Sequence, residues 1–275
     1  MNLLKKVLVG LTVAALSAGA LGCGSNNDAA KPADSGKQAG AVFSQIKKNK
    51  EIKIGTEGTY APYSYHTSDG KLTGFDVEIA TELAKRLGVK PIFVETKWDS
   101  MIAGLDAGRF DVIINQVAVT DQRKQKFDFS NPYIYIHEVL IVRKDNNTLK
   151  KFEQLKGQNV AQVLGSNLGK KAEKYGGKLV SVDGFQQSVD LVRDGRAVGT
   201  VNTDVVFADY LKKKPDAPLK IVDTNETPVV CAIPVKKGND DLVKAINEQL
   251  EAMKKDGTLK KISNKYFGKD VTINK

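Results

Sequence analysis

The sequence predicts an α/β fold made of two similar lobes. Strand and helix patterns alternate along residues 52–115, and the same alternation recurs after Phe152. The two stretches also resemble each other in sequence, and β-rich segments flank the second one. A chain of 275 residues with 41% hydrophobic content is long enough for two lobes that each bury a core.

The first alternating stretch has the order β-α-β-α-β. Strand patterns cover residues 52–57, 90–95 and 111–115, and a helix pattern covers residues 98–108. The other helix, expected over residues 74–88, ends at a glycine and gathers apolar side chains on one face: Phe75, Ile79, Ala80, Leu83, Ala84 and Leu87. Because helical crossovers join parallel strands, this order predicts a parallel sheet.

The second alternating stretch repeats this order. Its strand and helix patterns follow one another over residues 159–164, 166–176, 178–183, 185–195, 197–202 and 204–214. Residues 98–115 align with residues 185–202 without a gap, which pairs the opening aromatic residues and also Asn115 with Asn202. This internal repeat indicates two lobes of the same design.

Two β-rich segments, residues 135–144 and 225–238, flank the second stretch. If the first lobe resumes after Gly238 with a helix over residues 240–257, both segments cross between the lobes and form a hinge. The alternative is two lobes in series followed by a helical appendage. With a hinge, the predicted boundaries are residues 46–137 and 231–275 for lobe 1, 143–225 for lobe 2, and 138–142 and 226–230 for the hinge strands.

The N-terminal residues have the layout of a secretory signal, predicted over residues 1–22. Lys5 and Lys6 precede an apolar run that ends in small residues and is shorter than the about 20 residues of a membrane span. The end of this run, "ALGC", resembles a bacterial lipobox, which would leave Cys23 as a lipidated N-terminus; alternatively, Cys23 is simply part of the signal. Residues 23–45, which include Cys23, are expected to form a polar tether, so we expect an extracytoplasmic protein anchored by lipid to the bacterial cell membrane.

Composition argues against several functions. The net charge is +10, but only six of the 42 basic residues are arginines and the lysines are dispersed, so we expect no nucleic-acid partner. His66 and His137 have no cysteine or acidic partners at metal spacing, and no zinc, phosphate-loop or nucleophile-elbow motif occurs. Cys231 lies in an apolar run, which is typical of a buried hydrophobe. We therefore expect no metal, no cofactor and no catalytic residue.

Polar residues follow the predicted strands at the edge where open α/β sheets bind ligands. The segment "TEGTYAPYSYH" follows the first strand, and "NQVAVTDQR" follows the third. In the second lobe, Ser166 and Asn167 begin a helix, whose free N–H groups and dipole favour an anion such as a carboxylate. Arg123 could bind the same carboxylate through two parallel hydrogen bonds.

Each of these residues also has an ordinary structural explanation. Arg123 lies in the charged run "DQRKQK", which could be a solvated face. The alternating tyrosines that begin with Tyr60 could cover an edge strand, and Trp98 could pack in the core. Ser166 could simply cap its helix. Composition and spacing alone leave these alternatives open.

Several long segments resemble the extracellular solute-binding proteins of polar amino-acid ABC importers, solute-binding family 3. They include "GTEGTYAPYSYH", "GKLTGFDVEIATELAKRLG", "TKWDSMIAGLDAGRFDVIINQVAVTDQR", "FDFSNPY" and "MKKDGTLKKISNKYFGKDV", and the resemblance runs from Ile52 to about Val271. The short motifs "EGTY", "TKW" and "INQV" are most similar to the cystine-binding branch. The resemblance implies a periplasmic-binding-protein-like type II fold, in which two lobes joined by two strands close over one L-amino acid.

The resemblance also implies a function. The protein would be a monomeric lipoprotein that captures L-cystine, or another polar or sulfur-containing amino acid, and delivers it to the permease subunits of an ABC importer. Two other classes are weaker. A dehydratase-like enzyme on the same fold would have only Glu57 as an obvious general acid, and a ligand-sensing input domain would need a further membrane span or signalling module.

The resemblance finally implies roles for individual residues. Arg123 would hold the ligand α-carboxylate together with the Thr120 side chain, the Ala118 N–H group and the helix start at Ser166 and Asn167. Tyr60 and Trp98 would form the apolar walls. Glu57, Asn115 and Gln116 would lie where the distal part of the ligand is read.

The ammonium group of the ligand is the open question. The family has an aspartate after the last strand of the second lobe, whereas this chain has Thr203 there and Asp204 one position later. A shift by one residue at a strand end can turn a side chain away from the cleft. Either Asp204 binds the ammonium through a local shift, or Thr203 does so together with another acid such as Glu57.

Overall fold

The computed structural model describes residues 41–274, which lie within one compact unit. The predicted signal peptide, the lipidation of Cys23 and most of the predicted tether lie outside the described residues. None of the helices within residues 41–274 is both long and apolar enough to cross a membrane.

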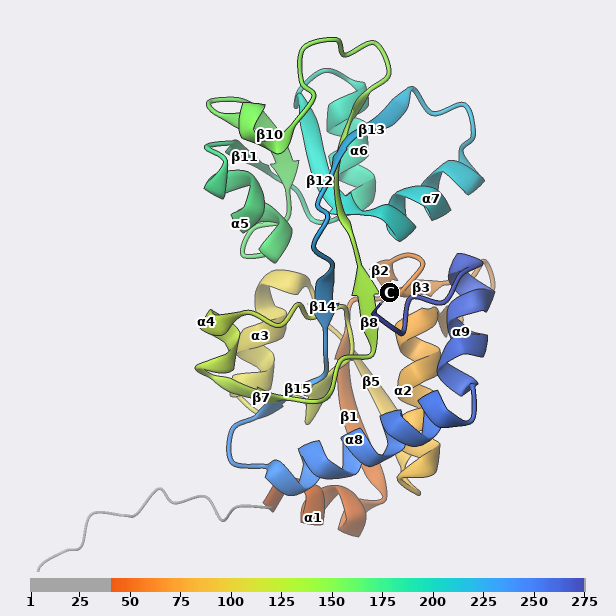
Figure 1. Cartoon of the computed structure of the whole chain (residues 1–275). Coiled ribbons are helices and arrows are strands. Elements are labelled where there is room, and N and C mark those ends of the chain that lie inside the picture. Colours follow the sequence, from red (N-terminus) through yellow and green to blue (C-terminus); the bar gives the residue numbers. More distant parts are fainter. Residues whose placement is uncertain (1–40, 275) are drawn as a thin grey trace, which may run out of the picture. The chain divides into compact units, whose positions relative to one another are not determined.

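The first lobe is built on a five-stranded sheet with the order β5-β1-β6-β15-β7 (Figure 1). Its strands are β1 (Glu51–Thr56), β5 (Lys90–Glu95), β6 (Val112–Ile113), β7 (Phe127–Phe129) and β15 (Pro234–Lys236). Strand β1 is parallel to β5 and β6, as the β-α-β order predicts, and β15 is antiparallel to both of its neighbours. The helices of this lobe include α2 (Phe75–Arg86), α3 (Trp98–Asp106) and α8 (Asp240–Lys255).

The second lobe is built on another five-stranded sheet, with the order β11-β10-β12-β9-β13. Its strands are β9 (Glu138–Arg143), β10 (Asn159–Gln162), β11 (Lys178–Ser181), β12 (Gly199–Thr203) and β13 (Leu219–Thr224). Its helices are α5 (Asn167–Lys174), α6 (Phe185–Arg193) and α7 (Asp204–Lys213), with a 3-10 turn at Phe152–Leu155. Three parallel strands are again followed by a strand, β9, that is antiparallel to both neighbours.

The chain crosses between the sheets twice. Strand β8 (Ile134–Ile136) pairs with β14 (Val229–Cys231) in a separate antiparallel two-stranded sheet (Figure 1). After the second crossing the chain returns to the first sheet as β15, so the hinge arrangement is correct and the lobes are not arranged in series. The paired crossover differs from the expected hinge ranges, because residues 138–142 form β9 inside the second sheet and residues 226–228 precede β14.

Several elements have no counterpart in the sequence-based prediction. Helix α1 (Ala41–Asn49) begins within the range expected for the tether and buries Ile46 in the first core. The other unpredicted elements are β7, β13 and the 3-10 turn, together with β2 (Thr59–Tyr60), β3 (Ser64–His66), β4 (Leu72–Thr73), α4 (Asp121–Lys124) and α9 (Thr258–Phe267). The hairpin-like strands β2 to β4 carry the residues that follow β1 up to the cleft between the lobes.

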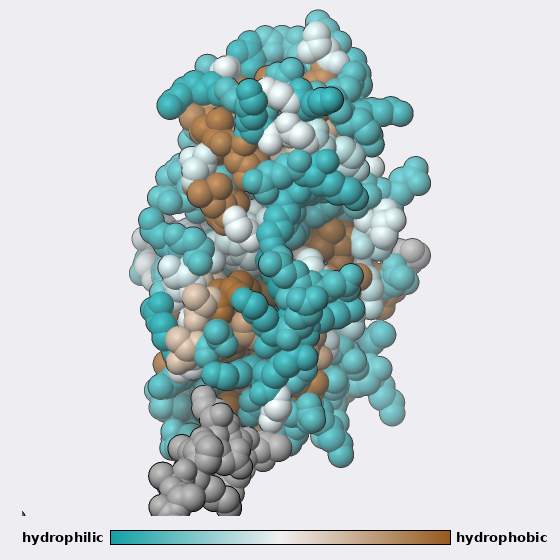
Figure 2. Space-filling view, turned by 90° about the vertical axis from the view of Figure 1, so that its left-hand side faces the viewer, coloured by the Kyte–Doolittle hydropathy of each residue, from teal (hydrophilic) through white to brown (hydrophobic). Residues whose placement is uncertain are grey.

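Apolar burial follows the predicted helix face. Every apolar residue predicted for the inner side of α2 is buried, with Phe75, Ile79 and Ala80 fully enclosed. Two apolar clusters lie within the second lobe, and the main cluster of the first lobe also includes Val205 and Val206 of α7. The two cores therefore touch where α7 begins. On the side that carries α4 and α5, the surface is mostly hydrophilic and its hydrophobic residues form small separate patches (Figure 2).

Candidate ligand-binding site

A cavity between the two lobes is the candidate site. It contains about 750 Å³ of space that protein atoms do not fill, part of it open to solvent. The first lobe lines it with the residues that follow β1 and β6 and with the start of α3: Glu57, Thr59, Tyr60, Trp98, Asn115 and Gln116. Because these positions lie at the carboxyl ends of parallel strands, the cavity is where an open α/β sheet binds ligands.

The second lobe lines the cavity with equivalent parts of its own sheet. The residues that the resemblance implied there, Ser166, Asn167 and Thr203, all face the cavity. Trp98 and Phe185, which each begin a helix, both line the cavity. Asn115 and Asn202 line it as well. The internal repeat therefore places matching residues on opposite walls of one cavity.

Asn115 organises the first-lobe wall. Its Oδ1 accepts hydrogen bonds from the Thr56 hydroxyl at 3.2 Å, the Glu57 N–H at 3.0 Å and the Ser64 hydroxyl at 3.1 Å. Its Nδ2 donates to Glu57 Oε2 at 2.6 Å, which fixes that carboxyl group against the wall. The Asn115 side chain therefore links β1, the Glu57 carboxyl group and Ser64 into one hydrogen-bonded wall.

Hydrogen bonds between the lobes close the cavity. Tyr60 donates to Asn202 Oδ1 at 3.0 Å, and the Tyr63 and Thr203 hydroxyls lie 3.1 Å apart. At the rim, Lys97 Nζ lies 3.2 Å from Asp183 Oδ2. The lobes thus meet through polar side chains from both walls.

Arg123 lies next to the cavity, behind one of its walls. Its guanidinium carbon is 5.2 Å from the centre of the Trp98 ring, and one of its nitrogens donates to the Ala118 carbonyl at 2.8 Å. Burial lowers the pKa of Arg123. Within residues 41–274 the guanidinium has no carboxylate partner, whereas the partly buried Arg86 and Arg143 both have one.

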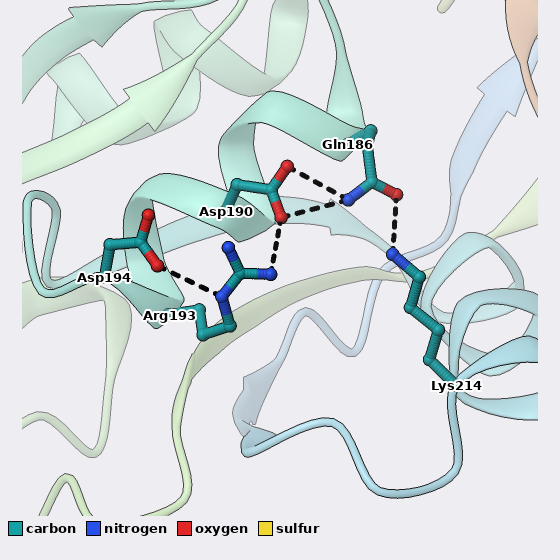
Figure 3. A network of polar contacts seen from close by, with 5 residues as sticks. All are labelled: Gln186, Asp190, Arg193, Asp194 and Lys214. Carbon is teal, nitrogen blue, oxygen red and sulfur yellow. Dashed lines mark hydrogen bonds and ion pairs between the residues drawn. The ribbon is translucent and has the colours of Figure 1, made fainter.

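Arg193 shows the usual surface arrangement for comparison. On the exposed side of α6, its guanidinium lies 2.8 Å from Asp190 and 3.0 Å from Asp194, in a network that extends through Gln186 to Lys214 (Figure 3). Arg123 is therefore unusual in being partly buried, close to a cavity and unmatched by an acid. Ala118, Thr120 and Arg123 themselves are not among the lining residues.

Two helix starts near the cavity are capped by their own side chains. Ser166 Oγ accepts from Gly169 N–H at 2.9 Å and donates to the Val163 carbonyl at 2.7 Å. Thr120 Oγ1 accepts from Arg123 N–H at 3.3 Å. Both residues thus have the capping role that their residue type favours, and Ser166 also faces the cavity.

Two acids of the first lobe have raised pKa values: Glu57, which lines the cavity, and Asp76, which is fully buried. Burial raises the pKa of the Glu57 carboxyl group to about 7, while the hydrogen bond from Asn115 acts in the opposite direction. Burial also raises the pKa of Asp76 to about 7, although its Oδ1 accepts from Gln116 Nε2 at 2.8 Å and from the Tyr133 hydroxyl at 3.1 Å. Gln116 adopts a φ of 54°, a left-handed backbone that is uncommon outside glycine.

Asp204 points away from the cavity. Its carboxylate lies 2.7 Å from Lys269 Nζ and accepts from the His137 N–H at 3.3 Å, on a surface that the cavity does not share. The backbone explains this placement, because Thr203 is the last residue of β12 and Asp204 the first of α7. The structure therefore brings Thr203, and not Asp204, to the ligand-facing wall.

Glu138 is a lining residue that the sequence analysis did not select. It is the first residue of β9, it is only 5% exposed, and its carboxylate lies 2.7 Å from Lys171 Nζ. The available signal was a single acid at the start of the otherwise apolar run "EVLIV". Cys231 also lines the cavity, and burial raises the pKa of its thiol well above the usual value.

The two lobes, the paired crossover and the cavity between the lobes define a two-lobe protein of the periplasmic-binding-protein-like fold. A family model for the bacterial extracellular solute-binding proteins, family 3, matches residues 52–269. The chain belongs to this family.

Two similar proteins each align with most of the chain. A probable amino-acid ABC transporter-binding protein of Haemophilus influenzae is 44% identical over 85% of this chain and 91% of its own length. The L-cystine-binding protein TcyA of Bacillus subtilis is 42% identical over 98% of this chain and 100% of its own length. Both relatives are named as binding proteins, and neither is named as an enzyme.

Solved structures confirm the fold. The L-cystine solute receptor of Neisseria gonorrhoeae, in its unliganded open conformation, is 45% identical, with a TM-score of 0.59 over 86% of this chain and 100% of that one. An ancestral arginine-binding protein bound to arginine is 38% identical, with a TM-score of 0.75 over 80% of this chain and 99% of that one. The chain is thus more similar in shape to the liganded protein, although its sequence is more similar to the open one.

Proposed function

We propose that the protein is the extracytoplasmic substrate-binding component of an amino-acid ABC importer and that its ligand is L-cystine. The observation that carries the proposal is the cavity, lined by both polar and apolar side chains, between two lobes that meet through Tyr60, Asn202, Tyr63 and Thr203. A ligand held in such a cavity touches both lobes. Its binding energy therefore favours the closed state over the open one, and a transporter can recognise that state.

The choice of cystine rests on the relatives. TcyA of Bacillus subtilis, which is named for L-cystine, aligns over 98% of this chain, and the cystine receptor of Neisseria gonorrhoeae shares 45% identity with it. The cavity adds chemical support, because it offers acids on both walls together with the aromatic rings of Tyr60 and Trp98. The acids suit the two ammonium groups of cystine, and the aromatic rings suit its apolar disulfide link. Its two carboxylates need cationic or N–H partners instead. Another polar or sulfur-containing amino acid is the alternative.

Arg123 is proposed to bind the ligand α-carboxylate. It is a partly buried cation without an acid partner, and it lies against Trp98 at the edge of the cavity. A modest rotation of the long side chain would replace the Ala118 carbonyl with a carboxylate, which accepts two parallel hydrogen bonds from a guanidinium. Thr120 then holds the backbone of α4 in place through its cap.

We also propose that the cavity has no catalytic function. Asn115 donates a hydrogen bond to the carboxyl group of Glu57, the acid with a raised pKa, and this contact fixes Glu57 as part of the wall. Incubation with a prephenate-like acid, followed by chromatography, tests this directly. Formation of a dehydrated product would overturn the binding-only proposal.

We also propose that the protein is anchored to the membrane by lipid and works with the permease subunits of its importer. Lipid on Cys23 would keep a monomeric binding protein next to the permease subunits of its importer. Metabolic labelling with a radioactive fatty acid checks this point, with the Cys23→Ala variant as the control. Label in the parent protein and none in the variant is the expected result.

A thermal-shift panel of the standard L-amino acids and L-cystine tests the ligand. Because ligand binds only the folded state, L-cystine at about 100 times its Kd should stabilise the protein by about 2.7 kcal/mol and raise its melting temperature by several degrees. A larger shift with a different amino acid would replace cystine as the ligand. No shift with any amino acid would contradict the proposed function.

A further inference from the structure

Two acids line the cavity, one from each lobe. Glu57 follows β1 in the first lobe, and Glu138 begins β9 in the second. Asp204 is turned toward Lys269, outside the cavity. If the proposed function is correct, the ligand brings an ammonium group that must leave water, and one of these two acids has to compensate for its lost hydration.

The sheet register places Glu138 beside Thr203. Strands β9 and β12 are antiparallel, and Glu138 is the direct partner of Thr203 in this pairing. Directly opposite residues of an antiparallel pair project on the same face, with Cβ atoms about 5 Å apart. Both residues line the cavity, so the carboxylate lies one strand across from the position at which this chain has a threonine.

The Glu138 carboxylate is built into the wall and still has acceptor capacity. Its Oε2 receives a hydrogen bond from Lys171 Nζ at 2.7 Å, and its Oε1 receives one from Asn167 Nδ2 at 3.3 Å. A carboxylate has about four acceptor positions, so about two remain for a ligand. The charge of Lys171 offsets part of the cost of burying Glu138 at 5% exposure.

Glu57 is the weaker ammonium acceptor. Asn115 already occupies its Oε2 at 2.6 Å, and burial raises its pKa to about 7, so the group carries only part of its charge at neutral pH. Glu57 also belongs to the same lobe as Arg123. A ligand bound through these two residues alone would leave its charged groups without a partner in the second lobe.

We propose that Glu138 accepts the ammonium group of the bound amino acid. The first lobe then binds the carboxylate through Arg123, and the second lobe binds the ammonium through Glu138. The zwitterion itself thereby bridges the lobes, and a free α-amino group becomes a requirement for closure. This inference rests on the proposed function and adds the residue that selects amino acids over other carboxylic acids.

The test compares L-cystine with 3,3′-dithiodipropionic acid, which has the same disulfide and carboxylates but no amino groups. Titration calorimetry should show that the parent protein prefers cystine. The Glu138→Gln variant, which has the same shape without the charge, should bind cystine about 10- to 100-fold more weakly, because a hydrogen bond to a charged group is lost. Its affinity for the diacid should change by less than about threefold, so the preference disappears.

Three further variants separate ligand contact from structural support. Lys171→Met removes the ion-pair partner and keeps the carboxylate, so it should retain the preference for cystine. Thr203→Asp added to Glu138→Gln returns a carboxylate to the neighbouring position and should restore at least about tenfold in cystine affinity. Asp194→Asn, in the exposed network of α6, is the matched acid control and should bind like the parent.

The possible outcomes separate this inference from the proposed function. Cystine binding by Glu138→Gln within about twofold of the parent overturns the role of Glu138 and leaves the proposed function intact. An equal loss of affinity for cystine and the diacid also overturns it, because the effect would then be structural. If the parent binds no amino acid, the proposed function fails and this inference fails with it. If Glu138→Gln does not fold, the double variant Glu138→Gln/Lys171→Met removes both buried charges and carries the same prediction.

Discussion

The two lobes have the same topology and different chemistry at the cavity. In both lobes, three parallel strands lie beside a strand that is antiparallel to its neighbours. In both lobes, a helix also begins with an aromatic residue at the cavity. In the first lobe, Asn115 bonds within its own wall, to Glu57, Thr56 and Ser64. In the second lobe, the matching Asn202 accepts from the Thr203 N–H of its own wall at 2.8 Å and also from Tyr60 of the opposite lobe at 3.0 Å.

The internal repeat determines where each asparagine lies, and the residues around it determine which hydrogen bonds it forms. Equivalent strand ends place both asparagines at the cavity, because the carboxyl ends of parallel strands meet at one edge. The first wall is then a self-contained network that can hold its shape without the other lobe. The second wall differs in that its Asn202 and Thr203 also form hydrogen bonds with Tyr60 and Tyr63 of the first lobe, and these contacts exist only in the closed state.

The largest expected effect on ligand binding comes from removing Arg123, the cation that the first lobe is proposed to supply. Arg123→Ala should weaken L-cystine binding by roughly 1,000-fold, about 4 kcal/mol, because a ligand carboxylate would be buried without its partner. Titration calorimetry measures this, and the apo melting temperature should change little. An alanine variant that binds as tightly as the parent would remove Arg123 from the site.

The asparagine pair tests the difference between the lobes through stability. Asn115→Ala leaves several buried donors without an acceptor and should lower the free energy of unfolding by about 3 kcal/mol. Asn202→Ala leaves one buried donor of its own wall, the Thr203 N–H, without its acceptor and should cost less stability, about 1 kcal/mol. It should also weaken ligand binding, because it removes the contact with Tyr60 between the lobes. Urea unfolding and calorimetry distinguish the two, and equal stability losses would contradict the comparison.

The buried acid of the first lobe predicts a pH dependence of stability. Burial raises the folded-state pKa of Asp76 from 3.8 to about 7, so the folded state binds its proton more tightly than the unfolded chain does. The stabilisation is fully present below pH about 4 and is lost as the pH rises through about 7. Asp76→Asn should therefore reduce the fall in unfolding free energy between pH 5 and pH 8 by about 2 kcal/mol. An unchanged pH profile in urea unfolding would contradict this assignment.

A smaller effect is expected at the second contact between the lobes. Tyr63→Phe keeps the buried ring and removes the hydroxyl that meets Thr203 at 3.1 Å. Cystine affinity should fall by about fivefold, or about 1 kcal/mol, because one neutral hydrogen bond of the closed state is lost. Calorimetry on this variant and on Tyr65→Phe, whose hydroxyl has no such contact between the lobes, supplies the matched comparison.

The smallest effect is expected at the surface. Arg193→Ala breaks the exposed network of α6 shown in Figure 3 and should change stability by less than about 0.5 kcal/mol, with no change in ligand affinity. Together with Arg123→Ala, it separates the effect of a buried, unmatched guanidinium from the effect of losing any arginine. A large loss of cystine binding in this variant would contradict the prediction, because losing an exposed arginine would then weaken binding as well.

Much of the fold could be predicted from local patterns. The apolar face of α2 and the alternation of strands and helices are periodic signals, and the repeat showed that the same unit occurs twice. The exact crossover strands could not be predicted, because residues 134–143 form one continuous β-rich stretch with a strand pattern on both sides of His137 and Glu138. Only tertiary pairing divides it into β8, which pairs with β14, and β9, which joins the second sheet.

The cavity was predictable in part. Glu57, Tyr60 and Asn115 follow strand ends in the sequence and line the cavity in the structure. Glu138 was missed because it begins a strand and is distant along the chain from its partner Thr203, so only the register of β9 against β12 reveals that they are neighbours. The outward orientation of Asp204 was one of the two alternatives that the sequence left open, and its partner Lys269, 65 residues further along the chain, could not be predicted.

The central claim is that one amino acid, bound by groups from both lobes, is the ligand of this protein. Titration calorimetry of the parent protein with L-cystine tests it most directly. We predict saturable binding of one cystine per chain with a Kd of roughly 1 μM, about −8 kcal/mol. Absence of binding heat with cystine and with every other amino acid, at protein concentrations well above this value, would contradict the account.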